Sequence, residues 1–170
     1  MEFITDPIHD IHYIYRFITA DDVDEEHADK TYVEIFMYTT SPLGIKLFDV
    51  IDHTVMETSS LALSDYQIYN FELYLLVKNV GLYRFGLSPS QRIHRKSFVE
   101  LKMNLNKFRV DGNGFNDDLA LVLSNDNTVY HYEWDLANAP NLVNKYTLMP
   151  FSEVEQLFVD YNFVIVKAKA

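Results

Sequence analysis

The chain contains no cysteine, and this absence removes several chemistries at once. Disulfide bonds, thiolate nucleophiles and cysteine-ligated zinc are excluded, and a reducing compartment inside the cell is favoured. The N-terminal segment MEFITDPIHDIH carries acidic residues where a signal peptide needs basic ones, and no run approaches the roughly 18 apolar residues of a membrane span. We therefore expect no export and no membrane span, and an intracellular location in the cytoplasm, the nucleus or an organelle.

Basic residues, glycine and proline are also scarce. The 14 Lys and Arg residues face 25 Asp and Glu residues, for a net charge of −11, which would repel a phosphate backbone. We expect no direct nucleic-acid partner. With only five Gly and five Pro but 12 Tyr and 12 Phe, the composition favours strands, and the 170 residues suffice for one ordinary domain.

The strongest strand-like runs recur along the chain. Their starts lie 40, 46 and 44 residues apart, a period typical of propeller blades, and the amphipathic helical pattern of other long repeats is missing. The four runs are Tyr32–Thr39, Glu72–Asn79, Asp118–Asn125 and Asn162–Lys169. A repeat of this length predicts β-sheets wound one after another.

Each of the first three runs has further strand-like segments around it, which completes a unit of four. A following hairpin partner is predicted at Leu43–Val50, Val80–Leu87 and Thr128–Asp135. An outer strand follows at His53–Ser59, Ser97–Met103 and Val143–Met149. An innermost strand precedes each run at Ile11–Thr19, Leu61–Tyr69, Asn106–Val110 and Val154–Val159. The predicted fold class is all-β, a partial β-propeller of four-stranded antiparallel blades in a single domain, with units at about 8–59, 60–103, 104–149 and 150–170.

The third strand of each complete unit ends near an aromatic residue, at Phe48-Asp49, Phe85-Gly86 and Trp134-Asp135. This pattern resembles the Trp-Asp ending of WD40 blades, in a degenerate form that spans nearly the whole chain. Because these aromatic residues recur in register with the strands, they are interpreted as packing between blades. The alternative is a β-sandwich or another meander with aromatic strand ends.

The fourth unit is expected to stop after two strands, which leaves the last blade incomplete. An unclosed array exposes unpaired N–H and C=O groups at its edge. We predict partner binding by β-augmentation at the last strand, through Phe163, Val164, Ile165 and Val166. The missing strands would come from another chain, from the rest of a longer protein, or from a second copy.

One basic cluster stands out in this acidic chain. Arg92, His94, Arg95 and Lys96 are expected on a loop that begins Ser88-Pro89-Ser90 and are predicted to contact an acidic partner segment or a phosphate. The alternative is that they only offset nearby carboxylates. The opposite charge gathers between residues 21 and 29, in an acidic stretch interpreted as a solvated loop.

Two segments carry metal-ligand residue types, but neither predicts a metal site. Asp6, His9, Asp10 and His12 are dense, yet His9 and His12 would point to opposite faces of a strand. The loop at Asp111–Asp118 is rich in oxygen ligands, but Val122 occupies the place where a calcium loop needs a bidentate Glu. We therefore expect no metal and no cofactor.

Catalytic motifs are also missing. There is no Gly-x-Ser-x-Gly, no Ser-x-x-Lys in a suitable context and no glycine-rich phosphate loop. The sequence therefore predicts a non-catalytic protein–protein interaction scaffold, a subunit of a hetero-complex. One alternative is a propeller-type hydrolase, in which His12, Asp65 and Asp111 would converge at an axial pocket. Another is a structural subunit of a large organellar assembly.

Overall fold

The computed structural model describes residues 2–6, 11–17, 31–40, 43–52, 56, 63–86, 94–113, 116–150, 152–160 and 163–169. Within these ranges the fourteen regular elements are all strands. They form three four-stranded sheets and one two-stranded sheet, and every described strand pair is antiparallel. The predicted all-β class is confirmed.

The first sheet has the order β1-β2-β3-β4. Its strands are β1 (Glu2–Asp6), β2 (Ile11–Phe17), β3 (Thr31–Thr40) and β4 (Leu43–Asp52). The segment of β2 was predicted as the innermost strand and the segment of β4 as the third, and both predictions are wrong by one strand. The inner place belongs to β1. This strand was not predicted, because its sequence EFITD is short and half polar. The outer strand predicted at 53–59 lies outside the described residues except for Met56.

The second and third sheets follow the predicted order from inner to outer strand. The second sheet consists of β5 (Leu63–Tyr69), β6 (Glu72–Val77), β7 (Gly81–Gly86) and β8 (His94–Glu100). The third sheet consists of β9 (Lys107–Gly112), β10 (Leu119–Ser124), β11 (Thr128–Trp134) and β12 (Asn141–Thr147). The outer strands begin two or three residues earlier than predicted.

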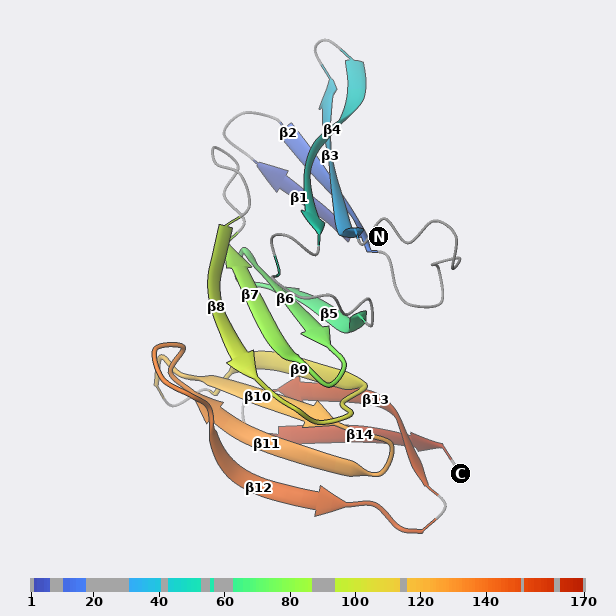
Figure 1. The fold of residues 1–170 in the computed structure, drawn as a ribbon, viewed down its shortest axis with the longest axis vertical. Helices are drawn as coiled ribbons and strands as arrows, with labels where there is room; N and C mark the ends of the chain where they lie inside the picture. Colours follow the sequence, from blue (N-terminus) through green and yellow to red (C-terminus); the bar gives the residue numbers. More distant parts are fainter. Residues whose placement is uncertain are drawn as a thin grey trace.

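The fourth sheet contains only two described strands, β13 (Glu153–Asp160) and β14 (Phe163–Lys169). Figure 1 shows the first three sheets following one another down the long axis of the molecule, with β13 and β14 against the third sheet. The inner strand β9 lies beside the inner strand β5 of the preceding sheet and beside β13 of the following one. This arrangement is compatible with blade-like repeats.

Three apolar clusters lie between successive sheets and explain why the second strand of a unit is so apolar. In β6, Leu73, Leu75 and Val77 face the first sheet, while Tyr74 and Leu76 face the third. Side chains alternate between the two faces of a strand, so a strand covered on both faces becomes continuously apolar. The same pattern recurs in β10, which is buried at every position.

Candidate functional site

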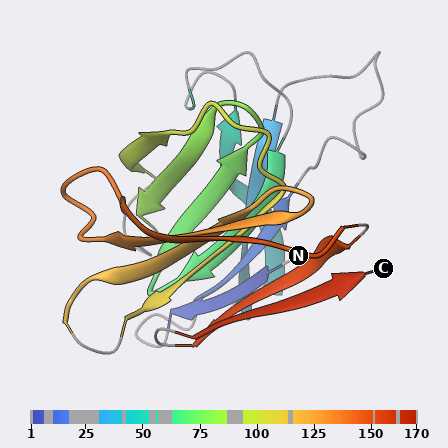
Figure 2. The same ribbon diagram turned by 90° about the horizontal axis from the view of Figure 1, so that it is seen from below.

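The fourth sheet is the one place where the described repeat is short of strands. β14 pairs with β13 from Phe163 to Lys169, and within the described chain no other strand pairs with it. Figure 2 shows these two strands as a narrow layer beside the broader third sheet. An edge strand of this kind presents unpaired backbone donors and acceptors on its open side.

The inner face of the fourth sheet is packed. Val154 and Leu157 of β13 are buried against Val122 and Val129 of the third sheet, and partly buried apolar side chains close this third cluster. Val164 and Val166 of β14 are among them. The Val154 N–H also donates a hydrogen bond of 2.7 Å to the carbonyl oxygen of Asp126. The fourth sheet is thus anchored to the body of the protein by its inner face.

The outer face of the fourth sheet is open and partly apolar. Phe158 of β13 is directly opposite Ile165 of β14, and the two residues are 48% and 55% exposed. Phe163 is 75% exposed. Large apolar side chains gathered on one exposed face mark an interaction surface. The site therefore combines an open hydrogen-bonding edge with an uncovered apolar face.

A second uncovered apolar row lies at the other end of the array, on β4 of the first sheet. Leu43, Ile45 and Leu47 are 76%, 62% and 55% exposed and, at alternate positions, share one face of the strand. This row was not predicted, because residues 43–50 were expected in a strand that is paired on both sides. Its signal was the alternation of apolar residues with Gly44 and Lys46.

At the junction between the second and third sheets, by contrast, the faces are covered and hydrogen bonds join the two sheets. The inner strands are joined across the sheets, because Asp65 accepts from the Phe108 N–H at 3.0 Å and from Arg109 Nη1 at 2.8 Å. Gln67 adds a reciprocal pair with the backbone of Val110, at 2.8 and 3.0 Å. A cavity of about 350 Å³ beside these residues is lined by Asp65, Gln67 and Arg109; Asp65 and Arg109 bind each other, and Gln67 binds the Val110 backbone.

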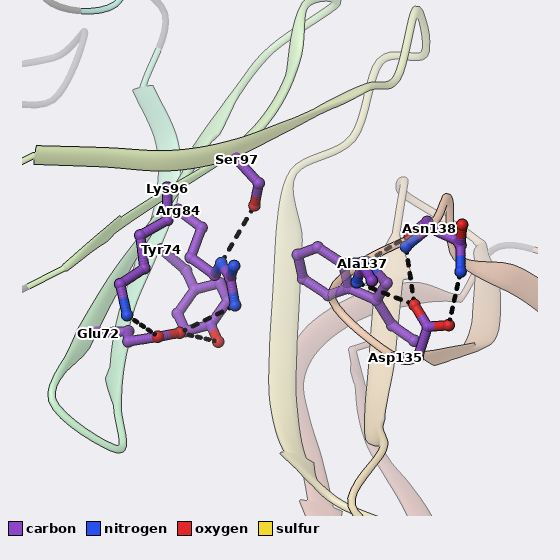
Figure 3. A network of polar contacts seen from close by, with 9 residues as sticks. Glu72, Tyr74, Arg84, Lys96, Ser97, Asp135, Ala137 and Asn138 are labelled. Atoms are coloured by element: carbon purple, nitrogen blue, oxygen red, sulfur yellow. Dashed lines mark hydrogen bonds and ion pairs between the residues drawn. The ribbon is translucent and has the colours of Figure 1, made fainter.

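A second network joins residues of β6, β7 and β8 within the second sheet (Figure 3). Glu72 binds Arg84 at 3.4 Å and Lys96 at 2.8 Å, and it accepts a hydrogen bond of 3.0 Å from the Tyr74 hydroxyl. Burial, together with the neighbouring Glu72, raises the pKa of Tyr74 above its usual value, so this hydroxyl stays a donor. Arg84 also lies over the ring of Trp134, 5.9 Å from its centroid.

The aromatic strand ends differ in what they do. Phe85 is buried against the first sheet and Trp134 against the second, which confirms the predicted packing between sheets for these two residues. Asp135 accepts hydrogen bonds from Asn138, and they lower its pKa below the usual range. Phe48 belongs to the outer strand β4, and not to a third strand as expected, although it packs against Tyr13 with the ring centroids 5.5 Å apart.

The basic cluster was predicted on a loop, but its described residues lie on the strand β8. Arg92 is outside the described residues, while His94, Arg95 and Lys96 are the exposed first residues of that strand. Lys96 binds Glu72, so part of the cluster offsets a carboxylate of the protein itself. The role of this cluster in partner contact stays a prediction.

The residues considered for chemistry have separate neighbours. The His12 ring lies 5.9 Å from that of Tyr38, Asp65 binds Arg109, and Asp111 accepts from the Gly112 N–H at 2.8 Å. His9 and Asp10 lie outside the described residues. Within the described ranges no three His, Asp or Glu residues form a group that could hold a metal ion.

The loop after β9 uses its oxygen atoms internally. Asn113 is buried, and its amide donates to Asn116 Oδ1 at 2.6 Å, while Asn116 Oδ1 also accepts from the Asp118 N–H at 2.9 Å. Val122 lies inside β10 as predicted. These contacts agree with the interpretation of the segment as a turn.

One buried histidine was not foreseen. His131 of β11 is opposite Val122 in register, so it lies on the face of the third sheet that is turned toward the fourth. Burial lowers its pKa from the usual value of 6.5, against an opposing effect of Glu133. Its Nε2 atom has no hydrogen-bond partner among the described residues.

Comparison with protein-family models, with curated proteins and with solved structures found no match for this chain. The class of the protein is therefore defined by its fold, an all-β chain of repeated four-stranded antiparallel sheets. In the described part of the chain, no helix is long and apolar enough to cross a membrane.

Proposed function

We propose that this chain is a non-catalytic scaffold for protein–protein interaction, a portion of a β-propeller that is degenerate relative to WD40 repeats. The strands that extend its fourth sheet come from another chain in a hetero-complex or from the rest of a longer protein. The observation that carries this proposal is β14, an apolar strand with one open edge and one open face. Its recognition mode would be β-augmentation, in which main-chain hydrogen bonds provide affinity and alternate side chains provide specificity.

The arrangement of the inner strands supports the propeller. β5, β9 and β13 are successive neighbours, and each is the first strand of its sheet, as expected when blades are arranged around an axis. The buried aromatic residues Phe85 and Trp134 support it as well, since each packs on the preceding sheet from a third strand. A propeller that is open at both ends needs a neighbour to cover β4 and β14.

Sedimentation velocity of the chain alone tests this proposal. Without its neighbour the chain should self-associate reversibly through its uncovered faces, and Ile165→Glu should weaken that association about tenfold, because burying one such side chain contributes about 1.5–3 kcal/mol. Leu142→Glu is the matched control, since Leu142 is 54% exposed on β12 and Ile165 is 55% exposed. A chain that stays monomeric, with the backbone amides of β14 exchanging as slowly as those of β10, would contradict the proposal.

A further inference from the structure

The outer face of β14 changes character along the strand. Phe163, Ile165, Lys167 and Lys169 alternate with Val164, Val166 and Ala168, and of the second set Val164 and Val166 pack toward the third sheet. Phe163 and Ile165 are strongly exposed, and so are the two lysines. The outer face of β14 is therefore apolar in its first half and basic in its second half.

The basic half is unusual for a chain with a net charge of −11. β14 carries two lysines and no acidic residue, while the acids of the fourth sheet belong to β13. Glu155 binds Lys167 at 3.0 Å on the β13 side, and Lys169 is in register with Glu153 on that side. At the unpaired edge of β14, a strand supplied by a partner would provide the cross-strand neighbours of both lysines.

Lysines on an open edge discourage indiscriminate strand pairing, and they select among the strands that can pair. A second copy of β14 fits this edge poorly. If two copies paired antiparallel about Val166, Lys169 would lie opposite Phe163 and Lys167 opposite Ile165, and registers shifted toward the C-terminal end of β14 would bring lysines together. A strand with acids at the matching positions forms favourable pairs instead.

Building on the proposed function, we infer that the strand that pairs with β14 is an antiparallel protein segment with a divided sequence. Its first half carries acidic residues opposite Lys169 and Lys167. Its second half carries apolar residues opposite Ile165 and Phe163. The intervening residues are apolar, because they lie beside Val164 and Val166 on the face that is turned toward the third sheet.

Extended versions of the full chain test this inference. Asn-Gly-Thr-Glu-Val-Glu-Val-Ile-Val-Phe is added after Ala170, so that the Asn-Gly turn folds the new strand back along β14 with its acids opposite Lys169 and Lys167. The matched control carries Lys in place of both Glu residues. Each extension is made in the natural background and with Lys167→Glu and Lys169→Glu, and amide hydrogen exchange of β14 is measured.

In the natural background the acidic extension should protect the β14 amides about tenfold more than the basic extension, given the size of cross-strand charge effects. In the doubly substituted background the preference should reverse, and high salt should reduce both differences. Equal protection by both extensions in both backgrounds would overturn the divided-sequence inference and leave the proposed function standing. If neither extension protects β14, the edge does not accept a strand, and the proposed function is overturned as well.

Discussion

β10 and β14 are the second strands of their sheets, and they are similar in sequence but opposite in environment. LALVLS in β10 is buried at every position, whereas FVIVKAK in β14 alternates between exposed and partly buried residues up to Val166 and is exposed from Lys167 to Lys169. β10 lies between β9 and β11 with a sheet on each face, while β14 has one described neighbour and one covered face. An apolar strand is thus core or candidate interface according to what lies beside it.

The largest expected effect comes from truncating an apolar side chain in each of these strands. Leu121→Ala in β10 should lower the free energy of unfolding by about 3–4 kcal/mol, because Leu121 is fully buried and the substitution leaves a cavity. Ile165→Ala in β14 should cost less than about 1 kcal/mol in the isolated chain, since Ile165 is 55% exposed. Denaturant titration measures both, and equal losses would remove the distinction between the two strands.

A pair of glycines compares close packing with open space. A Cβ atom on Gly81 would collide with the carbonyl oxygen of Val99, and its φ of +156° is one that other residues rarely adopt. Gly81→Ala should therefore destabilise by about 2–3 kcal/mol. Gly44 on β4 has nothing within 4 Å of the same position, so Gly44→Ala should change stability by less than about 0.5 kcal/mol. Thermal unfolding of both variants is the measurement, and a tolerated Gly81→Ala would contradict the tight approach of β7 and β8.

The hydrogen bonds between inner strands provide a third comparison. Asp65→Ala should cost about 1–2 kcal/mol, because it removes the side-chain acceptor of the Phe108 N–H and the ion pair with Arg109. Glu100→Gln removes an ion pair with Lys102 whose side chains are 62% and 78% exposed, and it should cost less than about 0.5 kcal/mol. If the two variants unfold alike in urea, Asp65 does not tie the second sheet to the third.

The smallest effect concerns His131 and the cover provided by the fourth sheet. Because burial lowers its pKa below 6.5, the unfolded chain binds its proton more readily than the folded chain does. Stability should therefore fall as pH drops below about 6.5 and level off below the folded pKa. The decrease between about pH 7.5 and pH 5.5 should be smaller in His131→Gln than in the natural chain. An identical pH dependence would show that His131 is not buried.

Several parts of this fold can be predicted from the sequence alone. The strands of the second and third sheets were predicted because runs such as ELYLLV and LALVLS are long, apolar and separated by turn residues. β1 was missed because a short, half-polar segment is recognised only through its pairing with β2. The contacts of Asp65 with Arg109 and of Gln67 with Val110 could not be predicted, since each joins residues more than 40 positions apart in sequence.

By itself the sequence determined that this protein is built of strands, where most of those strands run and that its units repeat, because apolar periodicity and turn chemistry are local properties. Only the tertiary structure decided which apolar residues are covered. Burial depends on which sheet lies against which, and Leu123 and Ile165, alike on paper, differ in this respect. The open edge of β14 is the clearest example, since within the described residues β14 pairs with β13 alone.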